Sequence, residues 1–215
     1  ISYFYPKENF FRANGEVIFT QGDTLKITCD QIEYDGTSKF AKAWGKVVLE
    51  RPDMNLKTDT LYLDRTNSRA FYNSFGTILD EKRKLTSIKG IYFMDEKKYR
   101  FISKVKIDDP EYLLNSQRLD YYTESDKAFF YGKTTIVGGE YDIYCEKGTY
   151  DTQFQRGNFQ ENAVIFYDNK EIRGDSLYFE NEKNYAAATN NVSVIDTLNK
   201  SVINGHYGEI FKAKD

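Results

Sequence analysis

The sequence has few of the residues on which enzymes rely for acid–base and metal chemistry. Its 215 residues include one histidine, His206, and two cysteines. One histidine excludes a metal site built from several histidines and catalysis by a histidine pair, and we expect His206 at the surface. No GxxxxGK, GxGxxG, GxSxG or CxxC motif occurs. We therefore expect a protein that is not an enzyme and that uses neither a metal nor a cofactor.

The sequence also lacks a strong charge of either sign and any long apolar run. Its net charge is -3 at pH 7, which leaves no basic footprint for nucleic acid. No window reaches the ~18 apolar residues that a membrane-spanning helix needs. The opening residues ISYFYPKENF have no basic region followed by an apolar run, so the given chain shows no signal peptide. We expect no nucleic-acid partner and no membrane-spanning helix.

One motif recurs along the chain about every 29 residues. It is clearest as LKITCDQIEYD, Leu25 to Asp35, in which we take Tyr34 as the anchor. Later anchors follow at steps of 29, 30, 28, 29 and 29 residues, and a period this steady is typical of a repeat architecture. The later anchors are Leu63, Phe93, Tyr121, Tyr150 and Phe179. An aliphatic residue comes two positions before most anchors: Ile32, Leu61, Ile91, Leu119 and Leu177.

The spacing inside the motif predicts bent β-strands. Apolar residues alternate with period two in each half, which places them on one face of a strand. The halves are three residues apart, so we expect a bend or bulge near Asp30, Asp59 and Asp175. In the second half of each repeat, glycines such as Gly45 and Gly132 stand where that strand would turn a corner. No segment has the 3.6-residue periodicity of a sizeable amphipathic helix.

These patterns predict an all-β fold: an elongated, twisted, solenoid-like stack of repeats, each made of two bent antiparallel strands. The chain has three prolines and no Ser/Gly-rich linker, so we expect one domain over residues 1–215. Residues 1–13 are rich in aromatics and are expected to cap the first repeat. The expected repeats, about seven in number, cover residues 14–44, 45–73, 76–103, 104–131, 132–159, 162–189 and 191–215.

The interior between two such sheets is an apolar trough, for which two hypotheses stand. Large aromatic anchors and small partner residues can close-pack into a filled core. Alternatively, the small positions leave room for an elongated apolar ligand. On the second hypothesis the alternation predicts which side chains would line the groove: Ile32, Tyr34, Leu61, Leu63, Ile91, Phe93, Leu119, Tyr121, Tyr150, Leu177 and Phe179.

The acidic residues that follow several anchors also allow two interpretations. Asp35, Asp64, Asp151 and Glu180 come directly after their anchors. Paired carboxylates are the tools of glycoside hydrolysis. Acidic side chains also start turns by accepting hydrogen bonds from nearby backbone N–H groups. Because these residues stand where strands end, we expect them to form turns.

The two cysteines occupy the same place in the first and the fifth repeat. Cys29 and Cys145 each lie five residues before an anchor. At ~4.8 Å per strand, four repeats of two strands separate them by roughly 38 Å, which is beyond the reach of a disulfide. We expect two free, buried thiols that act as small apolar residues.

The repeat resembles that of the OstA-like family, which includes the lipopolysaccharide-transport protein LptA and the N-terminal domain of LptD. The resemblance is carried by Gly15 to Glu50, GEVIFTQGDTLKITCDQIEYDGTSKFAKAWGKVVLE, and again by Asn162 to Val194. It implies a twisted β-jellyroll in the periplasm that bridges to the outer membrane. It also implies that lipopolysaccharide is the ligand, with its acyl chains in the apolar groove. The implied partners are other OstA-like or Lpt proteins, or a second copy of the chain, bound by edge-to-edge strand pairing.

Two other functions remain open at this point. A structural repeat or assembly module would have a filled core and no lipid ligand. A solenoid carbohydrate enzyme would need acidic and basic residues clustered on one concave face, and the charges here are scattered.

Overall fold

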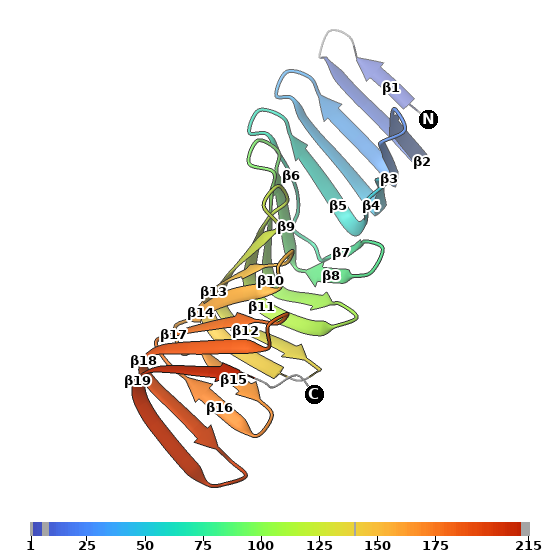
Figure 1. Ribbon diagram of the computed structural model, residues 1–215. Coiled ribbons are helices and arrows are strands. Elements are labelled where there is room, and N and C mark those ends of the chain that lie inside the picture. Colours follow the sequence, from blue (N-terminus) through green and yellow to red (C-terminus); the bar gives the residue numbers. More distant parts are fainter. Residues whose placement is uncertain (1, 6–8, 140, 212–215) are drawn as a thin grey trace. The chain divides into compact units, whose positions relative to one another are not determined.

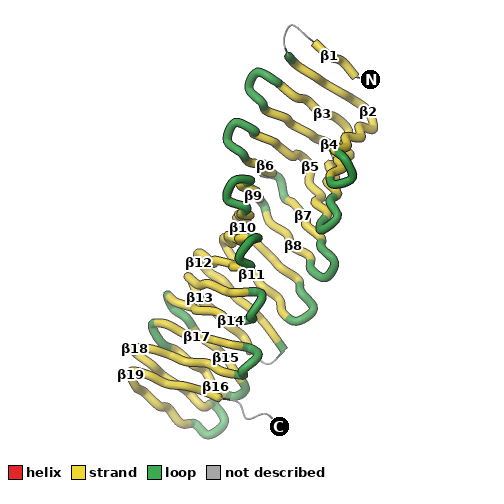
Figure 2. The backbone as a smooth tube through the Cα atoms, turned by 45° about the horizontal axis from the view of Figure 1, so that its top comes forward, coloured by secondary structure: helices red, strands yellow, loops and turns green. Residues whose placement is uncertain are grey.

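The computed structural model describes residues 2–5, 9–139 and 141–211, and its strands are drawn in Figures 1 and 2. The described residues form strands joined by short turns, without a helix. The all-β prediction is therefore confirmed. Contacts divide the chain into two compact units, unit 1 (Ile1–Pro110) and unit 2 (Glu111–Asp215). The single domain and the repeat boundaries stay predictions.

In its described residues, unit 1 contains ten strands, most of which are paired with the next strand along the chain. They are β1 (Ser2–Tyr5), β2 (Phe10–Gln21), β3 (Leu25–Asp35), β4 (Phe40–Glu50), β5 (Asn55–Asp64), β6 (Arg69–Tyr72), β7 (Gly76–Leu79), β8 (Lys84–Ser87), β9 (Lys89–Phe93) and β10 (Lys98–Asp108). In Figure 2, β2 to β5 run side by side in chain order, and all these pairs are antiparallel. Of the expected cap, β1 pairs with the start of β2, while residues 1 and 6–8 lie outside the described residues.

Unit 2 repeats the same antiparallel arrangement, with nine strands among residues 111–139 and 141–211. They are β11 (Tyr112–Tyr122), β12 (Lys127–Gly138), β13 (Tyr141–Asp151), β14 (Arg156–Gln160), β15 (Val164–Tyr167), β16 (Lys170–Arg173), β17 (Ser176–Glu180), β18 (Tyr185–Asp196) and β19 (Ser201–Phe211). Where a strand is interrupted at the bend, its two halves are separate short strands that pair with the same long neighbour. Thus β13 pairs with both β14 and β15, and β18 with both β17 and β16.

The predicted bends lie where the strands change register. The pairing of β3 with β4 shifts between Thr28 and Gln31, around Asp30. On the β4 side, Gly45 and Lys46 both have positive φ, at 76° and 54°. This left-handed backbone turns the chain, and glycine adopts it at no steric cost. Near Asp175 the bend is a full interruption between β16 and β17. Each bent strand therefore contributes one half to each of two facing sheets.

The backbone repeats with a uniform period. Positive φ recurs near the end of the turn after each anchor, at positions that are 29 residues apart. These residues are Lys39, Ser68, Lys97, Asp126, Gln155 and Asn184. The steps of 30 and 28 residues inferred around Phe93 are therefore an error of alignment.

Strand pairing corrects two of the predicted interior residues. Ala70 pairs with Leu63 on one side and with Tyr92 on the other, so Tyr92 is the anchor of the third repeat. Ile91 and Phe93 alternate with it and lie on the outward face. The cause is Gly90, which takes the position where most other repeats carry an aliphatic residue.

Candidate functional site

The interior of each unit is crossed by a row of buried side chains that we call the corner row. Its members are 29 residues apart, and each is at most 4% exposed. The row consists of Ala43, Tyr72 and Phe101 in unit 1, and of Phe130, Phe159 and Ala188 in unit 2. In sequence order, the first and last members of the row are therefore alanines, and the four between them are aromatic.

In unit 1 the two sheets enclose an apolar surface that is incompletely covered. Its floor is a buried cluster of Cys29, Ala43, Val47, Leu56, Leu61 and Tyr72. Partly exposed walls pack against this floor: Val17, Ile27, Ile32, Leu49, Met54 and Ile78. We call this surface the unit 1 trough. The six wall side chains are apolar and only partly buried.

In unit 2 the equivalent surface is filled. Ile143 and Ile172, which take the same repeat position as the wall residue Ile27, are 2% exposed. Ile165, between them in the ladder, is fully buried. The rings of Tyr141 and Phe179 pack across the opening with centroids 4.4 Å apart. The interior of unit 2 is therefore close-packed, as expected of a structural core.

A shallow depression remains at the rim of unit 2. It has an open volume of about 330 Å³ and lies beside the aromatic pair of Tyr141 and Phe179. Ile165, Ala186 and Ile210 are also in its lining, with Asn181 and Asn184 as polar members. This volume includes open solvent, so the depression is not an enclosed cavity.

The predicted groove residues fall into three groups. Partly exposed interior positions are Ile32, Tyr34, Leu63, Tyr121 and Tyr150. Positions whose side chains are buried by their neighbours are Leu61, Leu119, Leu177 and Phe179. The third group, Ile91 and Phe93, lies on the outward face.

Only part of the predicted list meets in one place. Ile32 and Leu61 come together in the unit 1 trough. The prediction missed the opposite wall, which Ile27, Leu49 and Ile78 provide from the second sheet. These residues were visible in the sequence as aliphatic positions on the other side of each bend, before it in β3 and after it in β4 and β7. The list was drawn from one side of the bends alone.

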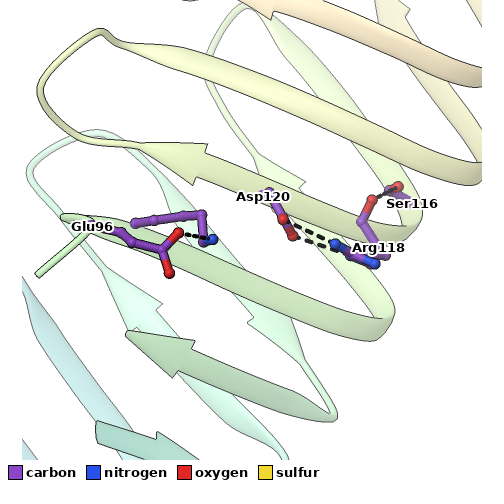
Figure 3. Close-up of polar contacts among 5 residues, drawn as sticks. Glu96, Ser116, Arg118 and Asp120 are labelled. Atoms are coloured by element: carbon purple, nitrogen blue, oxygen red, sulfur yellow. Dashed lines mark hydrogen bonds and ion pairs between the residues drawn. The ribbon is translucent and has the colours of Figure 1, made fainter. Parts of the chain in front are cut away.

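Charged side chains pair on the outward face. In unit 2, Arg118 makes a two-pronged ion pair with Asp120, with nitrogen–oxygen distances of 3.2 and 3.0 Å (Figure 3). The Ser116 hydroxyl donates to the backbone carbonyl of Arg118 at 3.0 Å. Arg118 also lies 4.4 Å from the ring centre of Tyr131. These contacts pair the charges of Arg118 and Asp120 with each other.

Three of the four acidic residues after the anchors make turns, as predicted. The Asp35 carboxylate accepts hydrogen bonds from the Thr37 N–H at 2.8 Å and the Ser38 hydroxyl at 2.8 Å. These bonds, the Ser38 hydroxyl first, lower the pKa of Asp35. Asp64 and Asp151 likewise accept from backbone N–H groups three residues later. The bonds make these carboxylates structural turn residues.

Glu180 differs from the other three acids. Its carboxylate accepts a hydrogen bond from the Tyr178 hydroxyl at 2.9 Å and pairs with Lys183 at 2.9 Å. Both partners are side chains, and they lower the pKa of Glu180. No backbone N–H is among the partners recorded for Glu180 in the described chain. The prediction that this carboxylate accepts hydrogen bonds from backbone N–H groups of the turn was therefore wrong for Glu180.

The cysteines and the histidine lie where they were expected. Cys29 and Cys145 are free and buried, and His206 is exposed on β19. No group of three or more metal-ligating side chains occurs in the described ranges. Among the same residues, no helix has the length and apolarity needed to cross a membrane.

The fold and its interior define a class: an antiparallel ladder of bent strands around an apolar core, built on a 29-residue period. Comparison with protein families gives the particular member of this class. The model of the OstA-like protein matches residues 1–117, which is more than half of the chain. The chain belongs to the OstA-like family.

Comparison with solved structures finds similar proteins. The crystal structure of LptH from Pseudomonas aeruginosa, titled the LptA homologous periplasmic component of the conserved lipopolysaccharide transport device, is 17% identical with a TM-score of 0.42. The match covers 46% of this chain and 76% of that chain. Among curated proteins, none matches the chain.

Proposed function

We propose that this protein is a non-enzymatic carrier that holds acyl chains of lipopolysaccharide in the unit 1 trough, as part of a periplasmic bridge to the outer membrane. The observation that carries the proposal is the apolar wall of Ile27, Ile32 and Leu49, which stays partly exposed in a folded protein. Membership of the OstA-like family supports the lipid and the compartment, because its periplasmic members carry lipopolysaccharide.

The physics of burial is sufficient for carriage without chemistry. Each methylene moved from water into an apolar surface contributes about 0.8 kcal/mol. A few methylenes against the walls therefore hold a chain reversibly. The sugars and phosphates of the lipid would stay in water, because the walls offer them no polar partner.

Both ends of the strand ladder support assembly with other chains. In the described chain, β19 pairs with β18 alone, and Ile203 and Phe211 on it are both 68% exposed. On β2, Ile18 is 67% exposed beyond the four residues that pair with β1. Unpaired strand edges bind further strands. We assign these edges to another OstA-like protein or a second copy of this chain.

The alternative function is a structural or assembly module without a lipid. The filled interior of unit 2 favours it, since Ile165 and Leu177 are fully buried and leave no room for a ligand. In our proposal the two units differ: unit 1 binds lipid, and unit 2 is a packed spacer.

Adjacent residues of β4 provide the test. Leu49 faces the trough, and Val48 alternates with it on the outward face. A charge at Leu49 would have to be desolvated by a bound chain, so Leu49→Asp should weaken lipopolysaccharide binding at least about tenfold, measured by displacement of a fluorescent lipid A analogue. Val48→Asp adds the same charge on the other face and should bind like the unaltered protein. Equal binding by all three proteins would contradict the proposed site.

A further inference from the structure

The outward face of strands β4, β5 and β6 in unit 1 carries aromatic and basic side chains together. Strand pairing places them side by side, since Lys42 pairs with Tyr62 and Tyr62 pairs with Phe71. Along each strand they alternate with residues of the buried interior, so they lie on the opposite face from the trough. All of them are partly exposed. We call this set the outer patch, and it consists of Phe40, Lys42, Trp44, Tyr62, Arg69 and Phe71.

The rings of the outer patch form one apolar surface across the three strands. The ring centroids of Phe40 and Tyr62 lie 6.0 Å apart. Those of Tyr62 and Phe71 lie 4.9 Å apart, and the two rings are stacked with an angle of 17° between their planes. Rings that contact one another in this way present a broad face to the outside of the sheet.

The basic groups of the outer patch lie over its rings. Lys42 Nζ is 4.7 Å from the ring centre of Trp44, and the guanidinium carbon of Arg69 is 5.3 Å from that of Phe71. The Trp44 ring is the one contact recorded for the Lys42 side chain among the described residues. Lys42 therefore adds a positive charge to an apolar surface.

The carboxylates next to the outer patch are bound by other groups. Asp64, which pairs with Phe40 and Arg69 in the ladder, is 6% exposed and accepts a hydrogen bond from Arg69 Nε at 3.1 Å. Glu33 lies opposite Lys42 on β3, but its recorded ion pair is with Arg12. Neither carboxylate is recorded as a partner of Lys42.

The fold does not require this chemistry, as the same positions four repeats later show. In unit 2 the equivalent strands β14, β17 and β18 pair in the same register. Their outward positions are Asn158, Gln160 and Ala187, where unit 1 has a lysine, a tryptophan and a phenylalanine. The ladder thus forms without rings or cations at these positions, which points to a role of the outer patch beyond packing.

We propose that the outer patch docks unit 1 on a membrane surface that contains anionic lipids. Aromatic rings with polar edges gather at the membrane–water interface, and each Lys or Arg near an anionic surface adds attraction. Single-stranded nucleic acid fits this surface less well, because its binding depends on many phosphate contacts. Since the trough lies on the other face of these strands, the inference is independent of the proposed carriage of lipid.

The unaltered full chain contains its own reporter of this contact. Trp44 is the single tryptophan of the protein, so intrinsic emission reads the environment of the outer patch. Vesicles of phosphatidylcholine that also contain phosphatidylglycerol should shift this emission to shorter wavelength. Phospholipids with brominated acyl chains should quench it, because the ring then lies at the edge of the apolar layer. Vesicles of phosphatidylcholine alone should have a much smaller effect.

Co-sedimentation with the same vesicles tests the charge. Lys42→Glu replaces a cation with an anion at the contact and should weaken binding at least about tenfold. Lys57→Glu is the matched control, because Lys57 is exposed on the same strand β5 but pairs with Val48 on the outward face of the second sheet. Lys57→Glu and the trough variant Leu49→Asp should both bind like the unaltered protein.

Three results would overturn the membrane contact and leave the carrier function untouched. The first is vesicle-bound protein in which brominated lipids do not quench Trp44. The second is equal binding to vesicles with and without phosphatidylglycerol, or equal loss of binding in Lys42→Glu and Lys57→Glu. The third is a shift of the Trp44 emission by a single-stranded oligonucleotide or a soluble phosphorylated sugar but not by vesicles.

Discussion

At the scale of single residues, polar and reactive side chains are used for packing and for turns. Tyr72 and Ser87 are polar, yet both are buried and satisfied by one another and by the Lys89 carbonyl. Asp35 lowers its pKa by binding its own turn. Cys29 and Cys145 serve as small interior residues. The chemistry of these side chains is therefore used for structure, which agrees with the absence of recognised catalytic motifs in the sequence.

The burial of the thiols predicts their reactivity. Burial raises the pKa of Cys145 to about 12 and also raises that of Cys29. The reactive thiolate is therefore scarce at pH 8. In the native protein, both cysteines should react with a thiol reagent far more slowly than in denaturant, Cys145 more slowly than Cys29, which is 6% exposed. Mass spectrometry after timed labelling gives the two rates, and native labelling as fast as in denaturant would contradict the burial.

At the scale of elements, strands differ in whether both of their edges are hydrogen-bonded to a neighbouring strand or only one. Paired strands in the middle of each unit have their backbone groups used on both sides, as for β4 between β3 and β5. The outer side of β19 has no recorded partner in the described residues. Exposed apolar side chains on an unpaired edge are unusual in a protein that stays alone.

The β19 edge gives a prediction on assembly. Ile203→Lys places a charge on the edge, and charged edge strands resist further pairing. Self-association, measured by sedimentation, should weaken at least about tenfold, because the lysine must be desolvated at the contact. Leu198→Lys is the matched control: Leu198 is 70% exposed but lies in the turn between β18 and β19. The two variants associating equally would show that β19 is not the contact.

The third repeat shows why the sequence predicts the strands more reliably than it predicts which face of a strand each side chain lies on. Alternation and the regular anchors predict the strands, the bends and the corners from local pattern alone. In β9, however, Gly90 replaces the expected aliphatic residue, and the alignment moved by one position to Ile91 and Phe93. The glycine is explained by the ring of Tyr72, which comes from another strand. A one-residue shift exchanges the two faces, so the error changed two interior residues.

At the scale of the whole chain, the sequence predicts that an apolar interior exists and leaves open whether it is filled. That outcome depends on how closely two sheets approach, which is set by ring sizes at Tyr72, Phe130 and Phe159 and by the glycines opposite them. The local sequence pattern does not show which glycine will lie opposite which ring in the folded protein. The structure assigns partly exposed walls to unit 1 and close packing to unit 2.

The central claim is that acyl chains enter unit 1 and not unit 2. The most direct measurement is site-specific photo-crosslinking to lipopolysaccharide, with a photo-reactive residue placed singly at Leu49, Val48 or Leu177. Leu49 lines the trough, Val48 lies beside it on the outward face, and Leu177 is fully buried in unit 2. The account predicts a crosslink from Leu49 that unlabelled lipid competes away, and none from the other two. A crosslink from Val48 equal to that from Leu49, or no crosslink from Leu49 in the folded protein, would contradict it.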